Sequence, residues 1–127
     1  MANPYQKYSQ NRVFTASKEE LTLMLYDGAL KFLNQAITAI DAKDMVKAGD
    51  LIIRTQNIIR EFQLTLNRGY EISRQLSEMY GYMHKRLVEA NVTKDAAILE
   101  EVRGLTRDFR DTWKEAMMTA RKQEVRG

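Results

Sequence analysis

The sequence contains no cysteine, one proline and one histidine among its 127 residues. Without cysteine the chain has no disulfide framework, no thiolate zinc site and no cysteine nucleophile. Its longest strongly apolar run, residues 23–26, is far shorter than the roughly 18 residues that span a bilayer, and the first twelve residues lack the apolar stretch of a signal peptide. We therefore expect a cytoplasmic protein without membrane insertion.

The single histidine also limits the chemistry. A carboxylate-bridged two-metal site in a helical bundle needs Glu-x-x-His on two helices, but the residue three positions before His84 is Gly81. The chain also lacks a glycine-rich phosphate loop after a strand and a Ser-His-Asp arrangement. We expect no enzyme activity, no metal and no cofactor.

Capping residues divide the chain into four segments of helical period. Ser17, followed three residues later by Glu20, forms a capping box, and Asp44 and Asp95 are further N-cap candidates. Gly69 can take the left-handed conformation that ends helices. The predicted helices, with approximate ends, are 17–41, 44–66, 71–91 and 96–122.

These segments have matched lengths and short links, which predict a fold. At 1.5 Å per residue each helix is roughly 30 to 40 Å long, and links of a few residues force antiparallel neighbours. We predict an all-α protein, an antiparallel up-down-up-down four-helix bundle. The expected organisation is one domain, 1–127, with an N-terminal arm at 1–16 and the bundle at 17–122.

Apolar stripes identify the expected core. The third and fourth segments each have one narrow stripe, formed by Ile72, Leu76, Met79, Tyr80, Met83, Leu87 and Ala90, and by Ile98, Val102, Leu105, Phe109, Trp113, Ala116 and Ala120. The first segment has two rows covering roughly 200° of the helix, more than one core face requires. These rows are Leu21, Leu25, Ala29, Phe32 and Ala36, and Leu23, Tyr26, Leu30, Leu33, Ile37 and Ile40.

The second segment also has more apolar surface than its core face needs. Its core stripe is Ala48, Leu51, Ile52, Ile58, Ile59, Phe62 and Leu66. On another face Val46, Ile53 and Leu64 line up, with Asn57 between them. Three interpretations remain open: scattered surface hydrophobics, residues buried by off-centre packing of the bundle, or part of a contiguous patch that binds a partner.

A basic row on the fourth segment supports an alternative function. Arg103, Arg107, Arg110, Lys114 and Arg121 share one side, where phosphate or an acidic partner would fit a small adaptor or nucleic-acid-binding bundle. Nearby acids permit helix pairs such as Arg107 with Asp111, and the net charge is only +3. We favour a solvated outer face and expect no nucleic-acid partner.

The N-terminal arm carries large or rigid residues in an otherwise polar segment, namely Pro4, Tyr5, Tyr8, Val13 and Phe14. Three of them are aromatic, which is unusual for a disordered tail. In one interpretation these residues pack permanently on the end of the bundle. In the other they contact a partner, or cover an apolar groove until the partner arrives.

Several stretches in order resemble a known family, the flagellar secretion chaperones of the FliS family. The stretches are NPYQKY at 3–8, TAS at 15–17, ELTLMLYDG at 20–28, QNII at 56–59, LTLN at 64–67, RLVEAN at 86–91 and DFRDTW at 108–113. They cover nearly the whole chain, and their order and spacing make the resemblance specific. Lys18 departs from the family pattern, where many relatives have proline after the capping serine.

The resemblance implies a four-helix bundle that binds the disordered C-terminal segment of flagellin and prevents premature polymerisation. It also implies delivery to a membrane protein of the flagellar export gate, a docking role that by position falls to Tyr5 and Tyr8. The surplus apolar surface of the first and second helices would then form a groove that holds a cargo helix. Asn57 and Asn67 would offer amide groups to cargo backbone, with solvation and turn formation as their alternatives.

Overall fold

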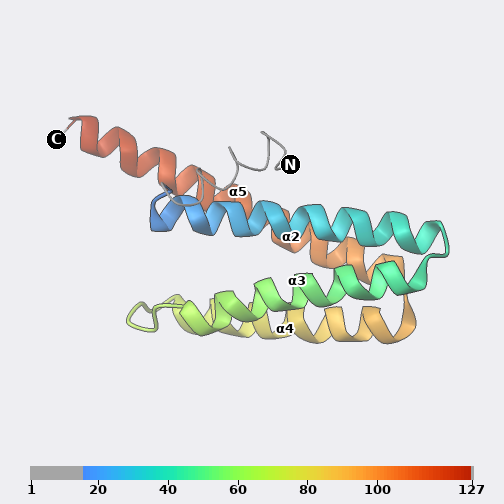
Figure 1. The fold of residues 1–127 in the computed structure, drawn as a ribbon. Helices are drawn as coiled ribbons and strands as arrows, with labels where there is room; N and C mark the ends of the chain where they lie inside the picture. The colour runs from blue at the N-terminus through green and yellow to red at the C-terminus, as the bar shows by residue number, and fades with distance from the viewer. Residues whose placement is uncertain (1–15, 127) are drawn as a thin grey trace.

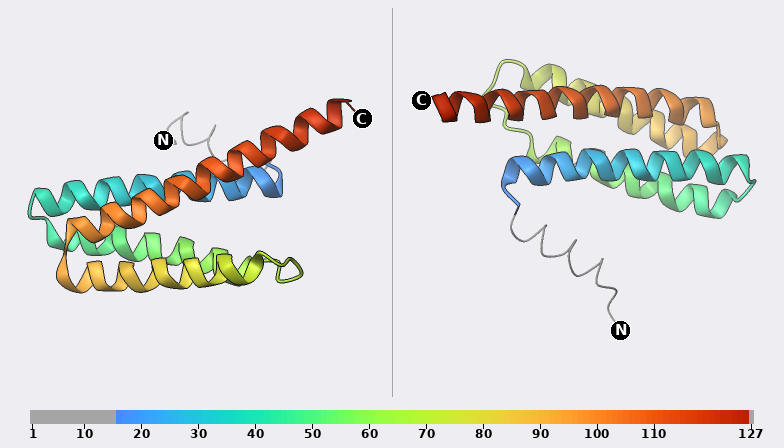
Figure 2. Two further views of the ribbon diagram at one scale, coloured as in Figure 1. Left: turned by 180° about the vertical axis from the view of Figure 1, so that it is seen from behind. Right: turned by 90° about the horizontal axis from the view of Figure 1, so that it is seen from above.

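The computed structural model describes residues 16–126, which form four α-helices (Figure 1). Successive helices run in opposite directions, and α2 and α4 each pack against both α3 and α5 (Figure 2). The predicted all-α, up-down-up-down four-helix bundle is therefore confirmed. The helices are α2 (Lys18–Asp41), α3 (Met45–Thr65), α4 (Ser73–Thr93) and α5 (Ala96–Arg126).

Three side chains cap helix N-termini as the sequence predicts. Ser17 Oγ and Asp44 Oδ1 each accept a hydrogen bond from the backbone N–H three residues later, at 3.1 and 3.2 Å. Asp95 Oδ1 accepts one from the N–H two residues later, at 2.9 Å. Each oxygen satisfies a donor that has no partner within its helix. The predicted starts of α2, α3 and α5 are confirmed.

The link between α3 and α4 differs from the prediction. Gly69 does not take the left-handed conformation; within residues 16–126 no glycine has a positive φ. Instead, Asn67 Oδ1 accepts a hydrogen bond from the Gly69 N–H at 2.9 Å, and the Ser73 hydroxyl donates to the Asn67 carbonyl. This Asx-type turn follows α3, and α4 begins at Ser73 rather than near residue 71.

Lysines take the left-handed positions at the other two links. Lys43 has a φ of 61° and Lys94 a φ of 53°. The Lys94 ammonium donates to the side-chain oxygen of Asn91 at 2.8 Å and to its backbone carbonyl, which places positive charge at the C-terminus of α4. Local hydrogen bonding thus supports a conformation that the sequence analysis assigned to glycine.

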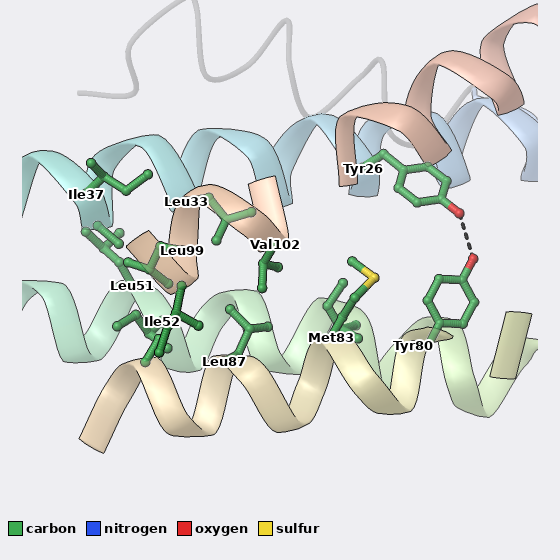
Figure 3. Packing of buried hydrophobic residues seen from close by; sticks show 14 of the residues in the cluster. Tyr26, Leu33, Ile37, Leu51, Ile52, Tyr80, Met83, Leu87, Leu99 and Val102 are labelled. Carbon is green, nitrogen blue, oxygen red and sulfur yellow. Dashed lines mark hydrogen bonds between the residues drawn. The ribbon is translucent and has the colours of Figure 1, made fainter. Parts of the chain in front are cut away.

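The core runs through the centre of the bundle and uses side chains from all four helices (Figure 3). Two buried threonines, Thr55 and Thr106, donate to the carbonyl oxygens four residues earlier, so their hydroxyls are satisfied within their own helices. Leu99 is fully buried although it lies beside the predicted stripe. The large apolar side chains with the least exposure are Leu33, Ile52, Ile59, Met83, Leu87, Leu99 and Val102.

The wide apolar surface of α2 is not surplus, contrary to the prediction. Both of its rows are buried or half-buried except Leu21, which lies in the first turn. The reason is that α2 packs more extensively against α3 and α5 than α4 does against the same two helices. The bundle thus covers the apolar stripe of α2, which is roughly 200° wide. The α2 helix therefore does not present the groove expected from its sequence.

The α5 helix ends later than predicted and extends past the rest of the bundle (Figures 1 and 2). Its last core contacts come from Phe109 and Trp113, and the Trp113 indole N–H donates to the Glu19 carbonyl at 3.0 Å. Beyond them Ala116 and Ala120 are exposed, so their predicted core role is wrong. Ile72, which precedes α4, is also exposed, so its predicted core role is wrong as well. Among the described helices, none combines the length and apolar content needed to cross a bilayer.

One aromatic ring from each helix forms a layer across the bundle. Phe62 of α3 stacks on Tyr26 of α2 and on Tyr80 of α4, with ring centroids 4.4 and 5.5 Å apart, and Phe109 of α5 lies 5.6 Å from Tyr80. The two tyrosine hydroxyls share a buried hydrogen bond of 2.7 Å (Figure 3). Burial raises the pKa of both tyrosines above the ordinary value of 10.

We expect this hydroxyl pair to behave as a unit. Tyr26→Phe alone leaves the Tyr80 hydroxyl buried without a partner and costs about 1–3 kcal/mol in urea unfolding, whereas the Tyr26→Phe, Tyr80→Phe double variant is nearly neutral. Because the folded pKa values are raised, stability is full below pH 10 and falls as the pH rises further. The double variant should lose less stability there. Additive single costs would contradict the coupling.

Candidate functional site

The predicted apolar face of α3 points into solvent. At 100° per residue Val46, Ile53, Asn57 and Leu64 lie within about 40° of one another and span about 27 Å of helix. Val46 is 88% exposed, Leu64 74% and Ile53 48%. Asn57 is also exposed. The α3 helix therefore carries a row of aliphatic side chains that the bundle does not cover.

The α4 helix extends this surface with two residues that the sequence analysis missed. Val88 is 42% exposed and Val92 is 80% exposed. They lie four residues apart, so they are neighbours on one side of α4. The available signal was their position beside the predicted stripe of α4, the same criterion that singled out Ile53 on α3. Whether this position places the two valines next to α3 depends on how α4 packs against its neighbouring helices.

A close contact brings the two sets together. A Cβ atom at Gly49 of α3 would lie 3.3 Å from the Asn91 side-chain oxygen of α4, so the helices nearly touch there. In antiparallel helices Ile53 and Val88 lie on the same side of this contact, about 6 and 4.5 Å along the axes. Val46 and Val92 lie on the other side. We call the surface formed by Val46, Ile53, Val88 and Val92 the α3–α4 face.

The remaining predicted site residues have different surroundings. Leu64 continues the α3 row toward the α3–α4 link, beyond the α3–α4 face itself. The side-chain oxygen of Asn67 already accepts the Gly69 N–H, so its amide NH2 group is the part left for a partner. Tyr5 and Tyr8 lie outside the described residues, as do Val13 and Phe14. The structure thus brings the α3 residues together and does not place the arm.

The predicted basic row of α5 is largely engaged by α2. Arg103 donates to the Asn34 side-chain oxygen at 3.0 Å. Arg110 pairs with Asp27 of α2 at 3.2 Å and with Asp111 at 2.8 Å, and these hydrogen bonds, the one with Asp111 first, raise the pKa of its guanidinium. The Arg107–Asp111 pair considered from the sequence is replaced by this arrangement, which favours helix packing over phosphate binding.

A second polar cluster joins α4 to α5. Glu101 accepts hydrogen bonds from the Tyr82 hydroxyl at 2.9 Å and from Arg86 at 3.0 Å, and these bonds lower the pKa of its carboxyl. Arg86 also pairs with Glu89 at 2.7 Å. All of these groups are at least partly exposed and mutually satisfied, which is typical of a structural ion-pair network. Within residues 16–126 no group of three or more histidine, cysteine, aspartate or glutamate side chains is placed so that it could hold a metal ion.

Comparisons with known proteins identify the family. The family model described as "Flagellar protein FliS" matches residues 1–120. The Flagellar secretion chaperone FliS of Bacillus subtilis (strain 168) is 50% identical over 120 residues, which cover 94% of this chain and 90% of that protein. The Flagellar secretion chaperone FliS of Salmonella typhimurium is 37% identical over 120 residues, covering 92% and 89%. This chain therefore belongs to the FliS family of flagellar secretion chaperones.

Proposed function

We propose that this protein is a cytoplasmic export chaperone that binds the C-terminal segment of flagellin on the α3–α4 face and on Leu64. Binding there keeps flagellin from polymerising before export. Membership of a family of flagellar secretion chaperones supports the nature of the cargo. The observation that supports the location is the set of aliphatic side chains exposed on two helices already in contact with each other.

The physical argument is that such a surface is unfavourable in water and favourable as an interface. Contiguous exposed apolar residues mark sites where a partner binds. The α3–α4 face is elongated along two parallel axes, which suits the apolar side of an amphipathic helix. A disordered segment that folds on this surface is ordered at the moment of binding.

Two asparagines provide polar contacts in this proposal. Asn57 lies between Ile53 and Leu64 on the same side of α3, where its amide can both donate to and accept from the backbone of the cargo. Asn67 follows the end of α3 and offers its amide NH2 group, because its oxygen is held by Gly69. In this proposal both amide groups form hydrogen bonds with backbone groups of the cargo that have no partner within a cargo helix.

Delivery to the export gate is the second half of the proposal. We assign docking on the gate membrane protein to Tyr5 and Tyr8, by the match of the N-terminal stretch to the family. The arm joins α2 next to the Trp113–Glu19 contact, at the end of the bundle where α5 extends past its neighbours.

Calorimetric titration tests the cargo proposal. The C-terminal segment of flagellin from the same organism, made as a peptide, should bind with a distinctly negative heat-capacity change, because apolar surface of both partners leaves water. The peptide should also gain helix in circular dichroism. A peptide of the same composition in scrambled order is the control. Absence of binding by the native segment would contradict the proposed function.

A further inference from the structure

Two basic residues continue the α3–α4 face beyond its aliphatic part. On α3, Val46, Ile53 and Arg60 recur every seven residues and therefore share one side of the helix at intervals of about 10.5 Å. Arg60 is exposed, as is Lys85 on α4. Along α3 the exposed row thus carries one basic residue, Arg60, between the aliphatic Ile53 and Leu64.

The packing of the helices brings the two cations level with each other. A Cβ atom at Gly81 of α4 would lie 3.4 Å from the Gln63 side-chain nitrogen of α3, so these two positions face each other across the α3–α4 contact. From this contact Arg60 lies three residues toward the start of α3, and Lys85 lies four residues toward the end of α4. Because the helices are antiparallel, both displacements point the same way and amount to about 4.5 and 6 Å. Arg60 and Lys85 therefore stand on opposite sides of the same contact line.

These cations have no acidic partner in the part of the chain that the structure describes. Three nearby acids pair with other cations: Asp50 with Arg54, Glu78 with Arg74 and Glu89 with Arg86. Glu61, next to Arg60 in the sequence, is exposed and forms no ion pair with a described residue. No carboxylate of residues 16–126 forms an ion pair with Arg60 or Lys85 within 4.0 Å. Arg60 and Lys85 are therefore exposed cations without a direct ion pair within the described residues.

We propose that Arg60 and Lys85 bind carboxylates of the cargo and thereby select an amphipathic helix with acidic residues beside its apolar side. This inference rests on the proposed function, since it concerns the segment bound on the α3–α4 face. A helix lying along the face contacts the Val46–Val92 level with one aliphatic residue and the Ile53–Val88 level with another about seven residues away. A carboxylate about seven residues further reaches Arg60 and Lys85. Charge complementarity at the rim fixes the register of the cargo and speeds its association.

Charge reversal tests this inference. Arg60→Glu with Lys85→Glu should weaken binding of the flagellin C-terminal peptide by about tenfold or more at low salt, because two attractive rim contacts become repulsive. Wild-type affinity should fall as salt increases from 0.05 to about 0.5 M, since exposed pairs are screened. Arg60→Gln with Lys85→Gln should remove most of that salt dependence. Helix content and urea unfolding of each variant confirm that the bundle is intact.

The matched control is Lys31→Glu with Arg107→Glu, which changes the net charge equally on the exposed sides of α2 and α5. An equal loss of affinity in both reversals would mean a general charge effect and would overturn the inference. Unchanged binding in the Arg60, Lys85 reversal, with loss of binding on Ile53→Asp, would overturn the inference and leave the proposed function standing. If wild-type protein does not bind the peptide at all, the proposed function fails and this inference with it.

Discussion

Replacing Ile53 and Leu64 together by aspartate should weaken binding of the flagellin C-terminal segment at least a hundredfold. Both side chains lie on the exposed side of α3, and burying an aliphatic side chain of this size contributes about 1.5–3 kcal/mol. The variant loses that contribution twice and places two carboxylates in an interface that excludes water. A hundredfold change corresponds to about 2.7 kcal/mol, which is slightly less than the roughly 3–6 kcal/mol that two such side chains contribute when fully buried.

The fold should tolerate this change, because neither side chain belongs to the core. Isothermal calorimetry with the peptide measures affinity, and urea unfolding measures stability in the same samples. The control is Gln35→Asp with Met118→Asp, which adds two carboxylates at exposed positions of α2 and α5. Wild-type affinity in the Ile53, Leu64 variant would show that cargo binds elsewhere. Equal losses in both variants would point to charge rather than contact.

The sequence predicts the helices well where capping chemistry is local. Ser17, Asp44 and Asp95 each act on a backbone N–H two or three residues away, so their effect does not depend on the rest of the fold. The left-handed conformation predicted for Gly69 is wrong because several kinds of turn can follow the C-terminus of a helix. Asn67 and Ser73 supply a side-chain turn instead, and the geometry of such a turn depends on how α3 and α4 pack.

Only the α3 half of the candidate site could be predicted from the sequence. Val46, Ile53 and Leu64 could be recognised on α3 because they stand apart from its core stripe. Val88 and Val92 became meaningful only when the Gly49–Asn91 contact placed them beside α3. That contact joins residues 42 positions apart, which periodicity within one helix cannot detect.

The prediction of surplus apolar surface on α2 is wrong for a related reason: burial depends on the neighbouring helices, which periodicity within one helix does not reveal. A stripe that looks too wide for one core face is correct for a helix packed tightly between two neighbours. Conversely, the stripe of α5 continues to Ala116 and Ala120 although the other helices have ended. In both helices the pattern indicates which residues are apolar, whereas burial depends on the extent of the neighbouring helices.

The aromatic layer predicts the second large effect. Phe62→Ala should lower the free energy of unfolding by about 3–5 kcal/mol, the usual range for removing a buried phenylalanine ring. Phe62 is 6% exposed and stacks on both Tyr26 and Tyr80, so its loss opens a cavity between three helices. Since domains of this size are stable by only about 5–15 kcal/mol, the variant should unfold at a much lower urea concentration.

A matched control separates the layer from aromatic content in general. Phe32 of α2 is only half-buried at the edge of the core, with the Arg54 guanidinium 5.9 Å above its ring. Phe32→Ala removes the same atoms but leaves a site open to water, so it should destabilise the bundle by much less than Phe62→Ala. Urea unfolding of both variants, followed by circular dichroism, makes the comparison. Equal losses would mean that the neighbouring rings close around the Phe62 site, and that the layer adapts rather than holds the four helices in a fixed register.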